Sequence, residues 1–385
     1  MIVATARVSA RASARARVRV CLLAAVASLS LACSSRHASA VGSGGSFELV
    51  VTKRSDPRAG VYLVGDRGKL LPALPRASLG GTIRSGFPIA NGSAVLVMVQ
   101  RDDETWAGLY RLALSRGSRV TATRLSAVAR GELVGASDDG RVAVLAEPLG
   151  RVGTRAEVHV WRAAGHPELA TPLTLRYHAG GDVAQQGGRA LVSGVPATCT
   201  ESWIGRCPMR VFTLDLASVG AGVREIPGGA YADYQPRFGA TLDTIVYQTT
   251  ANDRSPQCAT NINACRHDLV TRDFWARTPP RPLRAGGLAW ASAANGKTEL
   301  FLSHATCRRL PCDRLVLYAS RDGGAHKPIA RDVANFAERW VSADGSHTAY
   351  VRNATNALDT HIVATDGTGD VALGDVMPLG WLRVD

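Results

Sequence analysis

Lysine is almost missing from this chain: only four of its 45 basic side chains are lysines (Lys53, Lys69, Lys297 and Lys327). The arginines that take their place are scattered, and no basic run follows residue 40. Residues 1–40 hold six arginines and no acidic residue, so removing them lowers the formal net charge from +13 to +7. Because a nucleic-acid-binding protein needs a clustered basic face, we expect no nucleic-acid partner.

Helical periodicity and the common catalytic and metal-binding motifs are also absent. No segment after residue 47 carries a 3.6-residue apolar period of helical length. The nine histidines form neither His-x-His nor His-Glu-x-x-His, and no Gly-x-Ser-x-Gly elbow occurs. We therefore predict no catalytic residue, no metal and no cofactor, and we favour a non-enzymatic role.

A short turn between two strand-like stretches recurs about every 50 residues, which is typical of β-propeller blades. The copies lie at Asn91-Gly92, Asp139-Gly140, Gly187-Gly188, Asp243, Asn295-Gly296 and Asp344-Gly345. Apolar and polar residues alternate around each turn, as half-buried antiparallel strands require. We expect these to be two-residue hairpin turns, with both central positions at positive φ.

The two ends of the repeat region are complementary. Phe47–Lys53 and the stretches after it lack a first strand, whereas Trp381–Val384 forms a first strand with nothing after it. Pairing these ends would close a ring and cover two exposed edges. We predict an all-β fold over residues 47–385, a β-propeller of seven four-stranded blades, with six or eight as alternatives. Trp290, Trp340 and Trp381 occupy equivalent places and are expected to pack between blades.

The N-terminus has the pattern of an export signal. Several arginines precede a 13-residue apolar stretch from Val20 to Ala32, too short to span a bilayer. We favour a lipoprotein signal over residues 1–32, lipidation at Cys33, and a Ser/Gly tether over residues 33–46. The alternative is ordinary cleavage after Ala40. The prediction is an exported protein of the periplasm or outer membrane, held by a lipid anchor only, or a secreted one.

Six later cysteines form three close pairs, at the same place in successive repeats: Cys199/Cys207, Cys258/Cys265 and Cys307/Cys312. Six cysteines allow 15 connectivities, but the repeat favours three local disulfides that each close a hairpin loop. A metal site is the weaker reading, because Cys-x-x-Cys spacing is absent. Disulfides require an oxidising compartment, in agreement with export.

The last repeat resembles the WD-like repeat of TolB-type propellers. It reads Trp340-Val-Ser-Ala-Asp344-Gly345, followed by His361-Ile-Val-Ala-Thr-Asp366-Gly367. The family's turn proline is replaced by Ala343, and the similarity concerns the propeller part only. The resemblance implies an envelope propeller that serves as a protein-interaction platform, and it carries over no catalytic residue.

Propellers commonly bind ligands on the face that carries the loops between the second and third strands. The candidate residues on that face are Arg101, Asp103, Trp106, Trp203, Arg206, Asn261, Arg308 and Arg309. Mixed charge with two tryptophans suits a protein or glycan surface. We predict a monomeric interaction scaffold that binds an envelope protein or a glycan. The alternatives are a hydrolase or lyase acting on glycans or lactones, and a glycan-binding module without turnover.

Overall fold

The computed structural model describes residues 46–384 with short gaps. The gaps are 57–58, 90, 116–118, 150–154, 164–168, 185–186, 200–206, 218–221, 229–232, 240, 242, 254, 256–257, 259–264, 305–314, 337–339 and 355–356. The expected signal, tether, lipidation site Cys33 and cleavage site after Ala40 therefore lie outside the described residues. No helix within the described part of the chain is long and apolar enough to cross a membrane.

The described residues form antiparallel sheets, with two short 3₁₀ turns at Asp66–Gly68 and Arg76–Ser78. The first sheet has the order β26 (Val376–Val384), β1 (Ser46–Lys53), β2 (Val61–Val64) and β3 (Leu70–Leu74). The second contains β4 (Thr82–Pro88), β5 (Val95–Gln100), β6 (Trp106–Ser115) and β7 (Arg119–Ser126).

A third sheet runs through seven strands: β8 (Glu132–Ala136), β9 (Val142–Pro148), β10 (Ala156–Arg162), β11 (Leu169–Val183), β12 (Arg189–Pro196), β13 (Arg210–Asp215) and β14 (Gly222–Glu225). The fourth contains β15 (Asp233–Phe238), β16 (Thr244–Thr249), β17 (Asp268–Asp273) and β18 (Arg281–Ala285). The fifth again has seven: β19 (Gly287–Ser292), β20 (Thr298–Ser303), β21 (Leu315–Arg321), β22 (Lys327–Asn335), β23 (His347–Ala354), β24 (Ala357–Ala364) and β25 (Val371–Gly374).

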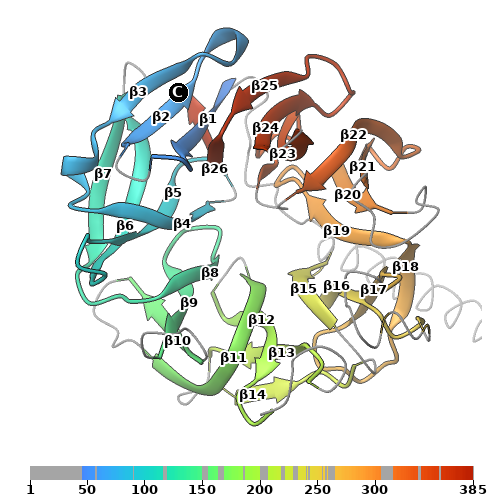
Figure 1. Ribbon diagram of the computed structural model, residues 1–385. Coiled ribbons are helices and arrows are strands. Elements are labelled where there is room, and N and C mark those ends of the chain that lie inside the picture. The colour runs from blue at the N-terminus through green and yellow to red at the C-terminus, as the bar shows by residue number, and fades with distance from the viewer. Residues whose placement is uncertain are drawn as a thin grey trace, which may run out of the picture. The chain divides into compact units, whose positions relative to one another are not determined.

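Consecutive sheets pack face to face and follow one another around a ring (Figure 1). Strand β5 shows why its sequence is a continuous apolar run. Val95, Val97 and Val99 join the core shared with the first sheet. Leu96 and Met98 point to the opposite side and join the core shared with β8 and β9. A strand that is buried on both faces cannot alternate apolar with polar residues. The chain is thus an all-β β-propeller.

The recurring turns are real, but their geometry differs from the prediction. In five of the six predicted turns one glycine has positive φ, between 66° and 72° at Gly92, Gly140, Gly187, Gly296 and Gly345, and the other residue of the predicted pair does not. The copy at Asp243 has no glycine, and Leu242 lies outside the described residues. Each of these glycines donates its N–H to the carbonyl three residues earlier, at 2.7–2.9 Å. The expectation of positive φ at both positions is therefore wrong.

The acidic or amide residue before the glycine stabilises the turn through its side chain. Oδ1 of Asn91, Asp139, Asn295 and Asp344 accepts the backbone N–H two residues later, at 2.8–3.0 Å. This side-chain bond stabilises the turn with the Asn or Asp outside the positive-φ region. The residue that follows has positive φ, a conformation that favours glycine. In the third copy that glycine is Gly187, not Gly188.

The predicted ring closure is confirmed. Strand β26 pairs antiparallel with β1, and Leu49 lies opposite Trp381. Trp340 and Trp381 are both 5% exposed and share one core with Leu49 and Val51. The Trp381 indole N–H donates to the Trp340 carbonyl at 2.8 Å. Trp290 is half-buried against the cluster of Val246, Leu269 and Phe301. Each of the three tryptophans contacts a core that is shared by two neighbouring sheets, as expected.

The two seven-stranded sheets each contain one long strand that belongs to two repeats. Strand β11 pairs with β10 through its first half and with β12 through its second. Strand β22 pairs with β21 and, through Val333 and Asn335, with β23. If each long strand is assigned to both of its repeats, the described strands group into seven four-stranded units. The number of blades stays a prediction.

Candidate functional site: the loop face and its polar rim

Two of the predicted contact residues, Arg101 and Asp103, lie in the β5–β6 loop, and a third, Trp106, is the first residue of β6. Arg101 and Asp103 are exposed, and Trp106 is half-buried against the core shared with β8 and β9. Asp103 accepts the Thr105 hydroxyl at 2.6 Å and its N–H at 3.0 Å, which lowers the pKa of the Asp103 carboxyl. Arg101 donates to the Trp106 carbonyl at 2.9 Å. These side chains fix the shape of their own loop.

The remaining candidates, Trp203, Arg206, Asn261, Arg308 and Arg309, lie outside the described residues, as do Cys307 and Cys312. Their place on the binding face stays a prediction. Cys199 and Cys207 are joined in the structure, with Cα atoms 5.7 Å apart, and Cys258 is joined to Cys265 across 4.4 Å. Both disulfides close loops between a second and a third strand.

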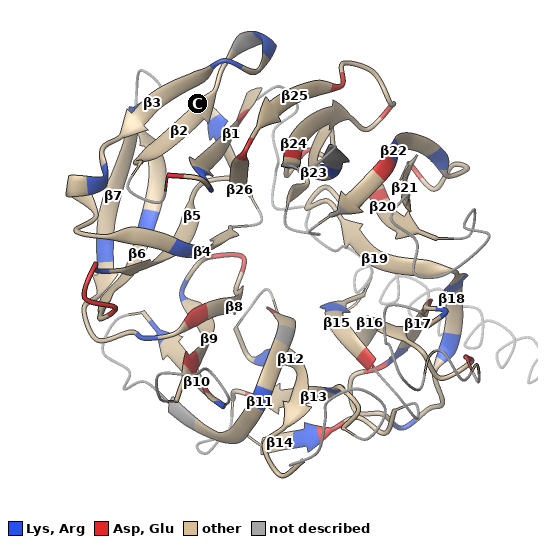
Figure 2. Cartoon of the chain, viewed as in Figure 1, with Lys and Arg blue, Asp and Glu red and all other residues tan. Residues whose placement is uncertain are grey.

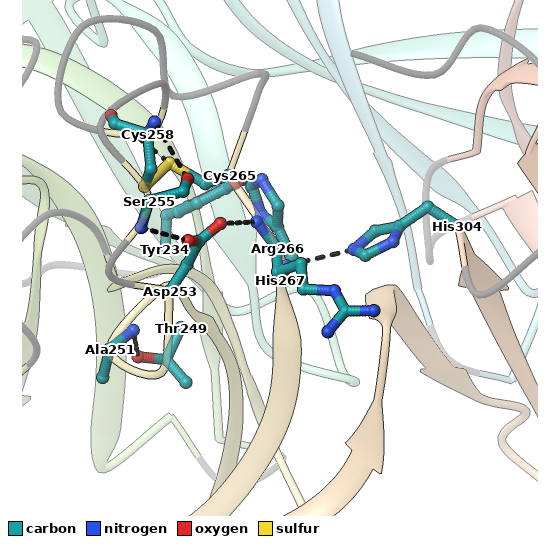
Figure 3. Close-up of a disulfide and its surroundings, with 10 residues drawn as sticks. All are labelled: Tyr234, Thr249, Ala251, Asp253, Ser255, Cys258, Cys265, Arg266, His267 and His304. Atoms are coloured by element: carbon teal, nitrogen blue, oxygen red, sulfur yellow. Dashed lines mark hydrogen bonds between the residues drawn. A yellow bond between two sulfur atoms is a disulfide. The ribbon is translucent and has the colours of Figure 1, made fainter. Parts of the chain in front are cut away.

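A group of buried polar residues lies near these disulfides, where the sheets containing β12, β15 and β19 meet. They include Ser193, Asp233, Gln248, Thr249, Thr250, Asp253, His267, Ser303 and His304. We use the term rim cluster for Tyr234, Asp253, Arg266, His267 and His304, which Figure 3 shows around the Cys258–Cys265 disulfide.

His267 is the centre of the rim cluster. Its Nδ1 lies 2.6 Å from the Tyr234 hydroxyl, and its backbone N–H donates to Nε2 of His304 at 3.0 Å. The two imidazole rings are edge-to-face, with centroids 6.0 Å apart. His267 is 4% exposed and His304 is 6% exposed. Burial lowers the pKa of His304 and raises that of Tyr234, so both groups are held neutral near pH 7.

Asp253 fixes the two stems of the disulfide loop. Its carboxylate accepts the N–H of Ser255 at 2.7 Å and the N–H of Arg266 at 2.5 Å. Burial raises the pKa of Asp253, but the hydrogen bonds from Arg266 and Ser255 outweigh burial and leave it below its usual value. Asp268 continues the anchoring, because it accepts the N–H of Gly286 at 2.9 Å at the start of the next sheet.

The innermost strand β15 is distorted at the same place. Gln235 has φ of 51°, and the pairing of β15 with β16 shifts register between Tyr234 and Arg237. The Gln235 N–H donates to the Ser193 hydroxyl of β12 at 3.2 Å. Backbone strain of this kind persists where surrounding contacts hold it. The bulge places Tyr234 against the loop of its own sheet, toward His267.

A second polar contact joins the innermost strands β11 and β15. The Asp182 carboxylate accepts the N–H of Phe238 at 2.9 Å and that of Val183 at 3.0 Å. Arg237 donates to the Gly181 carbonyl. Burial raises the pKa of Asp182 to about 6, although the Arg237 guanidinium opposes this shift. Asp182 thus ionises near neutral pH in a position that links two sheets.

Among the described residues, no group of three His, Cys, Asp or Glu side chains is placed to hold a metal ion. Figure 2 shows segments with Lys or Arg and segments with Asp or Glu interspersed around the ring. The rim cluster can hold loops in place by directional hydrogen bonds, and it contains two imidazoles and a phenol that can exchange protons.

Sequence reasoning missed the rim cluster. His267 and His304 are 37 residues apart and share no motif. A usable signal existed, because His267 follows the second cysteine of one pair by two residues and His304 precedes the first cysteine of the next by three. In this structure the end of one loop lies beside the start of the corresponding loop in the next sheet, so these two flanks were candidates for contact.

Comparison with known protein families and with curated proteins finds no match. Similar solved structures exist. A functionally unknown protein from Desulfotomaculum acetoxidans has 10% identity and a TM-score of 0.54 over 87% of this chain and 99% of the other. An oligogalacturonate lyase in complex with manganese has 12% identity and a TM-score of 0.53 over 87% and 86%. A putative TolB from Agrobacterium tumefaciens has 13% identity and a TM-score of 0.49 over 80% and 98%. Similarity at these identities concerns the propeller fold alone.

Proposed function

We propose that the chain is an exported, non-enzymatic β-propeller whose loop face binds another protein of the cell envelope, with lipidation at Cys33 as its anchor. The observation that supports this role is the way the loop stems are held. Disulfides close two neighbouring loops, and Asp253, His267 and His304 tie the stem of the second to the body of the propeller. Loops fixed before binding lose less conformational entropy when a partner docks.

The side chains of the loop face and the local disulfides are both consistent with this role. The exposed Arg101 and Asp103 lie beside the half-buried Trp106, the mixture of charge and aromatic surface found at protein interfaces. Local disulfides persist in oxidising compartments, as the arginine-rich, apolar N-terminus predicts.

A glycan hydrolase or lyase is the second candidate, because two histidines and a tyrosine gather at the loop face. Against it, both imidazole rings are almost fully buried. Nδ1 of His267 and Nε2 of His304 are also engaged in hydrogen bonds within the protein. A catalytic base has to reach the substrate proton directly or through one water.

Site-specific photo-crosslinking in intact cells tests the proposal. A photo-reactive residue at Asp103 should give one discrete protein adduct in the envelope fraction. The matched control is Lys297, which is exposed at the turn between a first and a second strand and so lies at the opposite end of the strands. Equal adducts at both positions, or none at Asp103, would refute the interaction face.

Two further measurements separate the alternatives. The intact mass of the mature protein, with and without reductant, distinguishes acylation at Cys33 from cleavage after Ala40 and counts the disulfides. Incubation with envelope and plant polysaccharides, followed by assay of reducing ends and unsaturated products, tests for turnover. Product formation that is lost in a His267→Ala variant would favour the enzyme over the scaffold.

A further inference from the structure

The hydrogen bond between His267 and His304 joins two neighbouring loops. His267 lies between Cys265 and the start of β17, at the end of the disulfide loop in its sheet. His304 follows β20 directly, at the start of the corresponding loop in the next sheet, and its own N–H donates to the Gly286 carbonyl at 3.1 Å. Figure 3 shows the His304 ring reaching across from its strand to the His267 backbone. The contact therefore connects two sheets at the loop face.

This contact depends on the protonation state of His304. The donor is a backbone N–H, which cannot act as an acceptor. Neutral imidazole offers one unprotonated nitrogen, here Nε2, whereas both nitrogens of imidazolium are donors. Protonation would place two donors against each other across 3.0 Å, so the bond must break.

The second contact of His267 lacks this property. Its partner is the Tyr234 hydroxyl, which can donate to Nδ1 or accept from it. In the protonated ring Nδ1–H would donate to the Tyr234 oxygen, so this bond persists whichever group donates when His267 is neutral. Of the two bonds, only the one to His304 is broken by acid.

The surroundings of His304 act on its pKa in both directions, and burial makes the neutral form the favoured one. Burial is the main cause of its lowered pKa, and the nearby Arg266 guanidinium acts in the same direction. The His267 N–H, itself a donor, and the carboxylate of Asp268 are close as well, and Asp268 opposes the shift. Tyr234 and Asp253 complete the surroundings on the side of His267. Since the folded chain binds His304 protons less readily than the unfolded chain does, acid destabilises this contact.

We propose that the His267–His304 hydrogen bond is an acid-sensitive latch between the loops of two adjacent blades, closed while His304 is neutral and released when it is protonated. Release removes one of the links between the stem after Cys265 and the neighbouring sheet, while the disulfide and the bond from Gly286 to Asp268 remain. The loop face is then rigid at neutral pH and loosened in acid. That a bound partner would be released as well rests on the proposed function, but the latch itself does not.

Hydrogen exchange of the His267 amide tests the latch in the full oxidised chain. Protection is measured between about pH 7.5 and about pH 4.5 and corrected for the intrinsic pH dependence of exchange. We expect protection to fall about fivefold to tenfold, the equivalent of one hydrogen bond. In a His304→Gln variant, the amide oxygen replaces Nε2 as an acceptor that does not titrate, so protection should stay constant.

Two controls make the result decisive. His178→Gln removes a histidine that pairs with Glu132 at 3.1 Å on another sheet, and this variant should keep the wild-type loss of protection. His304→Ala should have low protection at both pH values. Constant protection in the wild type, or the wild-type loss in His304→Gln, would overturn the latch.

A measurement on the unsubstituted protein covers the case in which a variant does not fold. The ring resonances of His304 should titrate at the same pH midpoint as the loss of His267 amide protection. Different midpoints would contradict the proposal. Because no partner is needed, this test can succeed even if the crosslinking experiment finds none.

Discussion

The junctions on the two sides of the β4–β7 sheet contrast with the junction between β12 and β15. The former are filled by aliphatic side chains such as Val97, Leu96 and Leu145. The latter also has an apolar core, with Leu191, Ile245 and Phe274, but it adds the polar contacts of Asp182 and Ser193 with the bulged strand β15, and we call it the polar junction. Both kinds of junction combine apolar packing with hydrogen bonds between sheets, such as the one from the Leu133 N–H to Ser85, but the polar junction also buries a carboxylate.

The difference determines how the stability of each junction depends on pH and on the loss of a hydrogen-bond partner. Apolar burial is non-directional and does not depend on pH. A buried hydrogen bond fixes one geometry, and removing one partner leaves the other unsatisfied at a cost of about 1–3 kcal/mol. The polar junction is therefore the place where small chemical changes should alter the protein.

The largest effect is expected at the apolar junction. Leu96 is 0% exposed and packs in the core with Phe87, Leu133 and Leu145. Leu96→Ala should lower the free energy of unfolding by about 3 kcal/mol, and equally at pH 5 and pH 7.5, because no charge is involved. Urea titrations at both pH values measure this.

The matched control is Leu283→Ala on β18, whose leucine is 45% exposed. It should change stability by less than about 0.5 kcal/mol. A strongly pH-dependent loss in Leu96→Ala would show that the two kinds of junction are not separable.

Asp182→Asn should change the pH dependence of stability at the polar junction. Burial raises the pKa of Asp182 to about 6, above its unfolded value. Its contribution to stability is full below the unfolded pKa and is lost as pH rises through about 6. Relative to the variant, the wild type should lose about 2–3 kcal/mol of unfolding free energy between about pH 4 and pH 7.

Urea unfolding curves of the wild type and of Asp182→Asn, measured at several pH values between about pH 4 and pH 7, give the difference in unfolding free energy directly. A constant difference would mean that Asp182 titrates alike in the folded and unfolded chains. A difference of the opposite sign would mean that the Arg237 charge, rather than burial, controls the carboxyl.

The smallest effect is expected from Tyr234→Phe, which removes one hydroxyl from the rim cluster. Nδ1 of His267 would lose its partner, so the melting temperature should fall by the equivalent of about 1 kcal/mol. Tyr318→Phe is the control, because Tyr318 stacks on Phe301 at 5.0 Å without a hydroxyl bond in the structure. Equal melting temperatures for the two variants would argue against a structural role for the rim cluster.

The predicted parts of the fold come from local patterns. The Asn-Gly and Asp-Gly turns mark the hairpins, and the incomplete repeats at the two ends led to the pairing of Leu49 with Trp381. The turn type was predicted wrongly, because an Asn-Gly pair fits both a two-residue turn and one in which only glycine is left-handed. Which of the two turn types forms depends on how the two strands of the hairpin pair, and the dipeptide alone does not specify that pairing.

The candidate site was predicted less well. The sequence indicated the loops, and Arg101 and Asp103 are exposed as a binding face requires, but both also serve to shape their own loop. The rim cluster was missed, since it combines residues from the neighbouring sheets that contain β15, β17 and β20. The spacing of residues along one strand does not show which residues of the next sheet they will contact.

The sequence by itself determined the repeat, the all-β architecture and the pairing of its ends, because turns and apolar alternation act over a few residues. Only the tertiary structure decided that His304 receives the His267 amide and that Asp182 meets the Phe238 amide of the next sheet. Those contacts depend on the angle and offset at which adjacent sheets pack, and these are set by all the side chains of a junction together.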